Sequence, residues 1–243
     1  LLVILFAAPL AAYLPIPAMA AVLVLVAMRL VAWHQIKVIF MASPVDAVVL
    51  TTTFAATLFV ELTFAVYVGV MLSLVLHLNR ISHPNIVSLH PDDLGDHRRF
   101  VTSRPGKECP QLKIIRIDGS LFFGSINFIE WALRDIDEDN PEQKHVLLIG
   151  SGINFIDVAG AELLVREARR RRQLGGDLYL CDVKAGVCDI LRKGGYLELF
   201  GRDNIFASKR EAIEKIFPRL DLERCQQCSV RTFTECASIE ARE

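Results

Sequence analysis

The chain has 243 residues, 52% of them hydrophobic, and a formal net charge of −1 at pH 7. A charge so close to zero gives no reason to expect nucleic-acid binding, which normally needs a basic surface, so no nucleic-acid partner is predicted. The average hides an asymmetry, because residues 1–80 hold only five formally charged side chains: Arg29, Lys37, Asp46, Glu61 and Arg80.

The apolar part has the composition of membrane-spanning helices, which need about 20 residues to cross about 30 Å of hydrocarbon. The chain begins inside an apolar run, residues 1–13, which we interpret as the end of a span in a longer protein whose earlier spans are missing. Pro17 suits the first turn of the next helix. Arg29, Trp33, His34 and Lys37 follow it, a mixture typical of a loop at the membrane–water interface.

Residues 45–78 are apolar again. One helix of that length would measure about 50 Å at ~1.5 Å per residue, too long for a bilayer, so two short helices meeting near Glu61 are predicted. Two helices also bring Arg29 and Lys37 to the same side of the membrane as the basic residues Arg80, Arg98 and Arg99. An excess of Lys and Arg marks the cytoplasmic side. Glu61 has two open interpretations, a group lining an ion path or a helix cap at the outer surface.

The polar part changes pattern near residue 112. Residues 81–111 are rich in Pro, His, Asp and Arg and predict a linker. Short apolar runs and amphipathic helices then alternate, which indicates an α/β sandwich with a mixed or parallel sheet. Strands are predicted at 112–117, 121–123, 146–149 and 178–181, and helices at 127–137, 157–174, 187–191 and 208–217. The run Arg169–Arg172 ends one helix and predicts a solvated face, or contact with anionic lipid.

The six cysteines, at positions 109, 181, 188, 225, 228 and 236, all lie in the polar part. In a cytoplasmic domain we expect reduced thiols. Cys225, Cys228 and Cys236 have a spacing that suits a metal, but a closed zinc site needs four ligands. The fourth would come from Cys181, Cys188, a carboxylate or another chain, and ordinary thiols are the alternative. No catalytic arrangement is found, so neither an enzyme nor a cofactor is predicted.

Two sets of residues resemble a known family. The apolar part carries, in order, Pro15-Ile-Pro17-Ala-Met-Ala-Ala-Val-Leu, Trp33-His34-Gln35-Ile36, Ser43-Pro44-Val-Asp46 and Phe59-Val-Glu61-Leu-Thr63-Phe-Ala-Val-Tyr-Val-Gly69. This order resembles the end of the transmembrane domain of SulP-type sulfate permeases and related anion transporters. Residues 154–161, Asn-Phe-Ile-Asp-Val-Ala-Gly-Ala, are similar to the loop and helix start of the STAS domain that follows in that family.

The resemblance implies all-α membrane helices, the end of an inverted-repeat transporter domain, followed by a soluble α/β STAS-like domain. It implies terminal gate-domain helices at 1–80, a linker at 81–111, the STAS-like domain at 112–217 and a cysteine-containing tail at 218–243. The anion site of such folds lies between two broken helices. In this family those helices precede residue 1, so we expect no substrate-binding residue in this chain.

The implied function is secondary transport of an inorganic anion, sulfate or a similar oxyanion, bicarbonate or halide. The alternative is a membrane-tethered STAS-type regulatory or scaffold protein without transport activity. We expect a multi-pass protein of the plasma or bacterial inner membrane, with the C-terminal domain in the cytoplasm. A homodimer and a cytoplasmic protein partner of the STAS-like domain are both open.

The helix start Asp157, Val158, Ala159 and Gly160 is the candidate site of the STAS-like domain. Related anti-sigma-factor antagonists carry a phosphorylated Ser in this loop, whereas Val158 and Ala159 have no hydroxyl group. A phosphorylation switch is therefore excluded at these two positions. Asp157 is predicted to cap the helix by accepting hydrogen bonds from first-turn amides, with partner binding as the alternative role.

Overall fold

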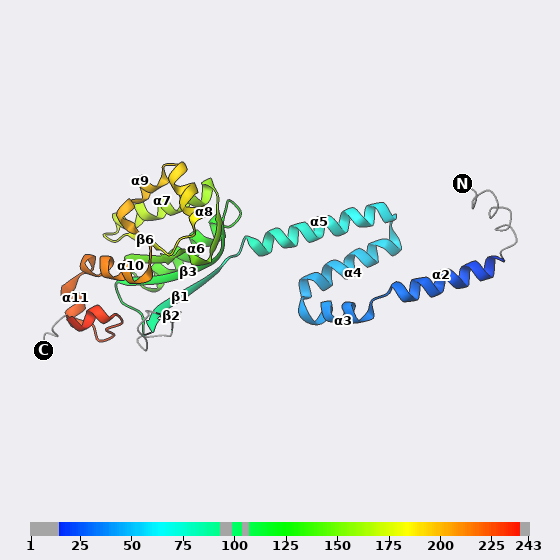
Figure 1. Ribbon diagram of the computed structural model, residues 1–243, viewed down its shortest axis with the longest axis horizontal. Coiled ribbons are helices and arrows are strands. Elements are labelled where there is room, and N and C mark those ends of the chain that lie inside the picture. The colour runs from blue at the N-terminus through cyan, green and yellow to red at the C-terminus, as the bar shows by residue number, and fades with distance from the viewer. Residues whose placement is uncertain (1–14, 93–98, 104–106, 239–243) are drawn as a thin grey trace. The chain divides into compact units, whose positions relative to one another are not determined.

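The computed structural model describes residues 15–92, 99–103 and 107–238 (Figure 1). The span expected at residues 1–13 lies outside these described residues. The chain divides into two compact units, one ending at Leu76 and the other beginning at His77.

The first unit is helical. Its helices are α2 (Ile16–Leu30), α3 (Trp33–Ala42), α4 (Pro44–Phe59) and α5 (Leu62–Ile81). Proline occupies the first turn of α2 and of α4, where its missing N–H costs nothing. The Ser43 hydroxyl accepts a hydrogen bond from the Asp46 amide at 3.3 Å and caps α4.

The predicted break near Glu61 is confirmed, because α4 ends at Phe59 and α5 begins at Leu62. Small residues let these two helices approach closely. A Cβ atom added at Gly69 on α5 would lie 2.6 Å from the Thr53 hydroxyl oxygen on α4, as in helix pairs packed through small side chains. The sequence predicts a loop that extends from Arg29 to Lys37. This extent is wrong, since only Val31 and Ala32 separate α2 from α3.

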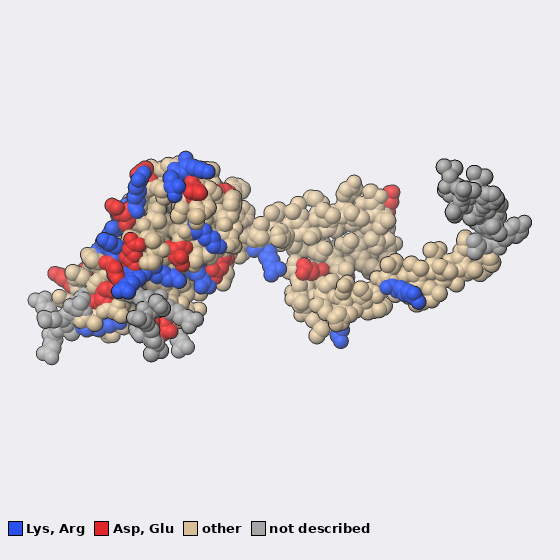
Figure 2. All heavy atoms as spheres, in the orientation of Figure 1, with Lys and Arg blue, Asp and Glu red and all other residues tan. Residues whose placement is uncertain are grey.

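Two stretches of the described chain are long and apolar enough to cross a membrane. They are Ile16–Ala42, which includes both α2 and α3, and Leu62–Ile81, whereas Pro44–Phe59 is apolar but shorter. Large apolar side chains of this unit are exposed, for example Leu23, Phe59 and Tyr67. Figure 2 shows almost no charged side chain on these helices, in contrast to the second unit. Exposed apolar surface of this extent needs lipid or protein to cover it.

The second unit is built on one mixed sheet. Its strands are β1 (Asn85–Asp92), β2 (Arg99–Thr102), β3 (Leu112–Leu121), β4 (His145–Ile149), β5 (Ile153–Ile156), β6 (Leu178–Cys181) and β7 (Ile205–Phe206). The order is β2-β1-β3-β4-β6-β7, and β5 pairs with the end of β3. The pairs from β3 to β7 are parallel, and β1 runs antiparallel to both of its neighbours.

Helices cover both faces of this sheet, as the continuous burial of successive side chains along β4 and β6 requires. The helices are α6 (Ile126–Asp139), α7 (Val158–Gln173), α8 (Ala185–Lys193), α9 (Tyr196–Phe200), α10 (Lys209–Ile216) and α11 (Leu222–Gln227). Ile115 and Leu148 face the core under α6, α7 and α8. Ile114 and Leu147 face a second core, to which α10 and the following residues contribute Ile213 and Phe217.

The structure corrects three expectations for the polar part. Residues 85–92 and 99–102 were expected in a linker, but they form the antiparallel strands β1 and β2, and β1 also pairs with β3 from Asn85 to Leu89. The strand expected at 121–123 is the end of β3 and a turn. The short strands β5 and β7 lacked a clear alternating pattern and were not predicted.

The arginine run at the end of α7 is not simply a solvated face. Arg171 is fully buried, and its Nε donates to Glu167 Oε1 at 2.8 Å. Its guanidinium also pairs with Asp137 of α6 and donates to the Gln143 carbonyl at 3.1 Å. Arg170 pairs with the same two carboxylates from the rim. This ion network ties α7 to α6.

Candidate functional site

Asp157 joins two loops at the carboxyl ends of β3 and β5. Its Oδ1 accepts a hydrogen bond from the Gly160 amide at 2.8 Å, which caps α7. Its Oδ2 accepts from the Phe123 amide at 2.9 Å, in the loop between β3 and α6. The capping bond agrees with the prediction from the sequence. The bond to Phe123 was not predicted, because 34 residues separate the two positions.

Gly160 allows α7 to start close to the end of β3. A Cβ atom at this position would lie 2.4 Å from the Leu121 carbonyl oxygen and 2.8 Å from its carbon, both backbone atoms. Val158 is exposed and Ala159 is half-buried. The four predicted residues therefore lie together, with Asp157 and Gly160 shaping the helix start and Val158 available to a partner.

Apolar side chains surround this helix start. Phe123, Phe155 and Val158 are 82%, 50% and 60% exposed, and all three lie in the two segments that Asp157 joins. Single exposed apolar residues are ordinary, but a group on one loop system indicates a contact surface.

The same β3–α6 loop touches the chain that leaves α5. A Cβ atom at Gly124 would lie 2.9 Å from the Ser82 hydroxyl oxygen. His83 packs edge-on against Phe128 at the start of α6, with ring centroids 5.0 Å apart. The residues that follow α5 are thus connected to Asp157 through one short loop.

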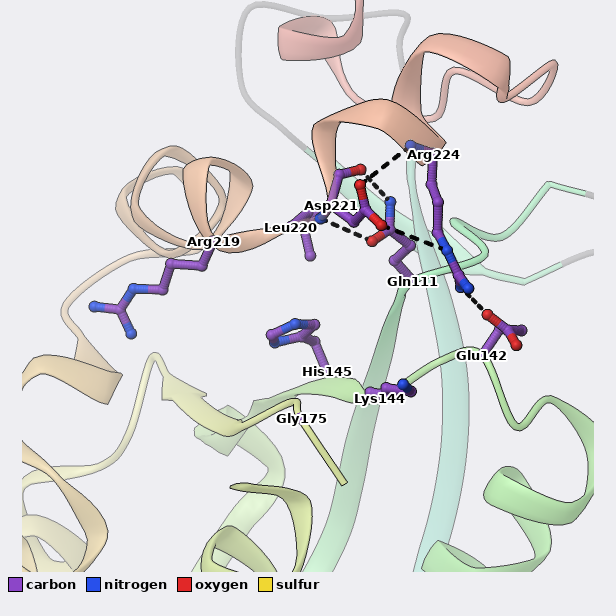
Figure 3. A pocket seen from close by; sticks show the side chains of 9 residues that line it. All are labelled: Gln111, Glu142, Lys144, His145, Gly175, Arg219, Leu220, Asp221 and Arg224. Atoms are coloured by element: carbon purple, nitrogen blue, oxygen red, sulfur yellow. Dashed lines mark hydrogen bonds and ion pairs between the residues drawn. The ribbon is translucent and has the colours of Figure 1, made fainter. Parts of the chain in front are cut away.

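A polar pocket of about 310 Å³ lies at the opposite end of the sheet, beside the amino ends of β3 and β4 (Figure 3). Its lining is mostly charged or polar: Gln111, Glu142, Lys144, His145, Gly175, Arg219, Leu220, Asp221 and Arg224. Arg224 is neutralised by pairing with Glu142 and Asp221. Lys144, which also lines this pocket, pairs with no carboxylate among the described residues.

Gln111 fixes one wall of the polar pocket. Its side-chain Nε2 donates to the Asp221 carbonyl and its Oε1 accepts from the Asp221 amide, both at 2.9 Å. On another wall, His145 Nδ1 lies 3.2 Å from the Tyr179 hydroxyl. Burial lowers the pKa of His145. The negative charge of Asp177 raises this pKa, whereas the positive charges of Arg219, Arg171 and Lys144 lower it further. His145 is therefore neutral at physiological pH.

A second, smaller pocket beside Gln111 brings four cysteines together. Cys109 precedes β3, Cys225 lies on α11, Cys228 follows it, and Cys236 lies in the 3₁₀ turn Thr234–Ser238. The predicted cysteines 225, 228 and 236 are thus grouped. Cys109 was not predicted to join them, since its position in the chain gives no sign that it approaches the tail.

Burial raises the pKa of the Cys109 thiol to about 11, although backbone hydrogen bonds from Gln111 and Leu112 act in the opposite direction. Burial also raises the pKa of Cys225 and Cys236. Protonated thiols of this kind are poor nucleophiles. In the part of the chain that the structure describes, no three His, Cys, Asp or Glu side chains already have the spacing of a bound metal.

Comparison with known proteins identifies the second unit. Residues 106–212 match the STAS domain family. The chain is 26% identical over 209 residues to YvdB of Bacillus subtilis (strain 168), to which sulfate transport is ascribed, covering 85% of this chain and 37% of that protein. It is 23% identical over 230 residues to sulfate transporter 1.3 of Arabidopsis thaliana, covering 90% of this chain and 35% of that protein.

A solved structure extends the likeness across both units. The murine Slc26a9 anion transporter in its inward-facing state superimposes with a TM-score of 0.66 at 20% identity, covering 77% of this chain and 30% of that chain. At this identity the match shows a shared fold. The chain spans about a third of the length of the curated relatives it matches. The relatives named here are transporters, not enzymes.

Proposed function

We propose that this chain, a homologue of the SulP-type sulfate transporters that carries a STAS domain, is the C-terminal part of a membrane transporter for inorganic anions. Sulfate or a similar oxyanion, bicarbonate and halide are the substrate classes. The observation that carries the proposal is the union, in one chain, of helices with exposed apolar surfaces and a STAS domain. The similarity to sulfate transporters runs through both parts.

We place residues 1–80 in the membrane as terminal helices of the transporter's gate part. The near absence of charge on these helices supports this placement. Arg29, Lys37 and Arg80 would mark the cytoplasmic side, which puts the STAS domain in the cytoplasm. In this arrangement the anion is bound by earlier helices, and the described chain supplies none of its ligands.

The STAS domain in this proposal regulates or assembles the transporter. The helix start at Asp157 and the apolar group Phe123, Phe155 and Val158 form its contact surface, which would meet a second copy or a cytoplasmic protein. The loop between β3 and α6 lies against Ser82, and Phe128 at the start of α6 packs against His83, directly after α5. A partner bound at Asp157 would therefore act on the residues that follow the last membrane helix.

Anion uptake tests the transport proposal. The complete protein, with the spans that precede this chain, is reconstituted into vesicles and supplied with labelled sulfate, bicarbonate, chloride or nitrate under Na⁺ or H⁺ gradients. We expect uptake of at least one anion above that of protein-free vesicles. No uptake of any anion under any gradient would refute transport and favour the membrane-tethered scaffold.

The regulatory role has its own test. The double variant Phe123→Ser/Phe155→Ser removes apolar contact surface without touching the Asp157 hydrogen bonds, which use a backbone amide and the carboxylate. We expect altered uptake or loss of association with the partner copy, while Trp131→Ser on α6, which is 79% exposed and close to Phe123 in this respect, leaves both unchanged. Equal behaviour of the two variants would refute this surface.

A further inference from the structure

The four cysteines of the smaller pocket come from two segments far apart in the chain. Cys109 lies in the loop before β3, and Cys225, Cys228 and Cys236 lie in the tail after α10. The remaining cysteines lie elsewhere: Cys181 is buried at the end of β6, and Cys188 is half-buried on α8. Folding thus selects four of six thiols and gathers them around one small cavity.

We propose that Cys109, Cys225, Cys228 and Cys236 bind a single zinc-class metal ion as four thiolates. Four thiolate ligands form the closed tetrahedral set of structural zinc sites, and the pair Cys225 and Cys228 has the two-residue spacing common in such sites. The tail alone supplies three ligands, which leaves the set incomplete. Cys109 completes it from within the same chain.

The surroundings of the thiols suit metal-bound sulfur. Gln111 Nε2 lies 3.3 Å from Cys225 Sγ, to which it donates a hydrogen bond. Donors of this kind orient ligands and delocalise the charge of bound thiolates, as outer-shell partners do at known metal sites.

The tail has a small core of its own, in which Leu220 and Phe233 are buried, and Arg224 pairs with Glu142 outside it. None of the described residues of α11 is buried. The tail is held by the bonds of Gln111 to Asp221, by a 3.3 Å hydrogen bond from Thr232 to the Lys107 carbonyl, and by the buried ring of Phe233. Short segments with so small a core commonly gain their stability from a metal or a cross-link.

Metal binding would close the pocket further, because the thiols line one cavity but are not yet at metal-binding spacing. Rotation about the Cα–Cβ bonds moves each sulfur without moving the backbone. On binding, each of the four thiols loses its proton to solvent and forms one metal–sulfur bond, so no oxidant or reductant takes part. The bound metal would hold the tail against the start of β3. This proposal does not depend on whether the protein transports anions.

Metal analysis of the complete protein tests the site. Purified in detergent without chelator, it is expected to contain about one zinc per chain. Cys228→Ser should lose the zinc, whereas Cys228→His, which restores a zinc ligand, and Cys188→Ser, which changes a thiol outside the pocket, should both keep it. With cobalt in place of zinc, the wild-type protein should show sulfur-to-cobalt charge-transfer absorption.

Thiol alkylation keeps the test valid if a serine variant fails to fold. In the wild-type protein, zinc should protect all four pocket cysteines from a maleimide, and a chelator should expose them together. Cys188 should react equally in both conditions. The proposal is overturned if the protein neither retains nor binds zinc, if an iron–sulfur cluster or a disulfide occupies the four cysteines, or if Cys188→Ser loses as much zinc as Cys228→Ser.

Discussion

Replacing Arg171 with Met should severely destabilise the STAS domain. Arg171 is fully buried and pairs with Glu167, which is 5% exposed, and with Asp137. Methionine keeps much of the apolar stem but removes the charge. The substitution leaves Glu167 buried with fewer partners and deprives the Gln143 carbonyl of its donor. Removing one member of a buried ion pair typically costs about 3–5 kcal/mol.

The lower end of this range applies, because Arg170 still contacts both carboxylates. A loss of about 3 kcal/mol is a large part of the roughly 5–15 kcal/mol that stabilises a typical domain. If the free energy of unfolding falls by about 2 kcal/mol per molar urea, the urea concentration at the unfolding midpoint should drop by about 1.5 M.

Pulse proteolysis of the chain in detergent across a urea series measures this midpoint. Arg169→Met is the matched control, since Arg169 is an exposed residue of the same helix and surface changes usually stay within about 0.5 kcal/mol. If Arg171→Met unfolds at the same urea concentration as Arg169→Met, the argument from the buried ion network is wrong.

Three further predictions concern the same domain and use the same assay. Gly160→Ala should lower the free energy of unfolding by about 1–3 kcal/mol, because the added Cβ would overlap the Leu121 backbone. Its control is Gly186→Ala, which should be neutral or slightly stabilising because the added Cβ meets nothing within 4 Å. Equal losses in the two variants would contradict the packing argument. Asp157→Ala should cost about 0.5–2 kcal/mol through loss of the cap, and an unchanged midpoint would count against it. Burial lowers the pKa of His145 in the folded domain below its ordinary 6.5. The imidazole therefore binds a proton more tightly in the unfolded chain than in the folded one. The free energy of unfolding should keep its full value above about pH 6.5 and fall as the pH drops toward the folded pKa. His145→Gln should remove that part of the pH dependence, and an identical pH profile would refute it.

Local signals predicted much of the fold. Asp157 caps α7 as the sequence predicts, and the helix predicted at 208–217 is α10, which Ser208 caps. The break near Glu61 followed from length alone, because one helix of that span exceeds a bilayer. These features depend on neighbouring residues, whose types restrict the backbone directly.

The β1–β2 hairpin shows where local signals fail. Its sequence contains Pro91 and several polar residues, so no regular alternation marks it as a strand pair. Pairing with β3 from Asn85 to Leu89 supplies the hydrogen bonds that the sequence pattern does not predict. Likewise, Arg171 differs from Arg169 only in the side of α7 on which it lies and in what packs there.

The sequence by itself determined that one half of the chain suits hydrocarbon and the other suits water, because charge and periodicity are properties of the chain. Only the tertiary structure decided that Cys109 joins Cys225, Cys228 and Cys236, and that Asp157 binds the Phe123 amide. Such contacts join residues 34 to more than 100 positions apart. Their formation depends on how β3 and the tail pack, which no local pattern of residues encodes.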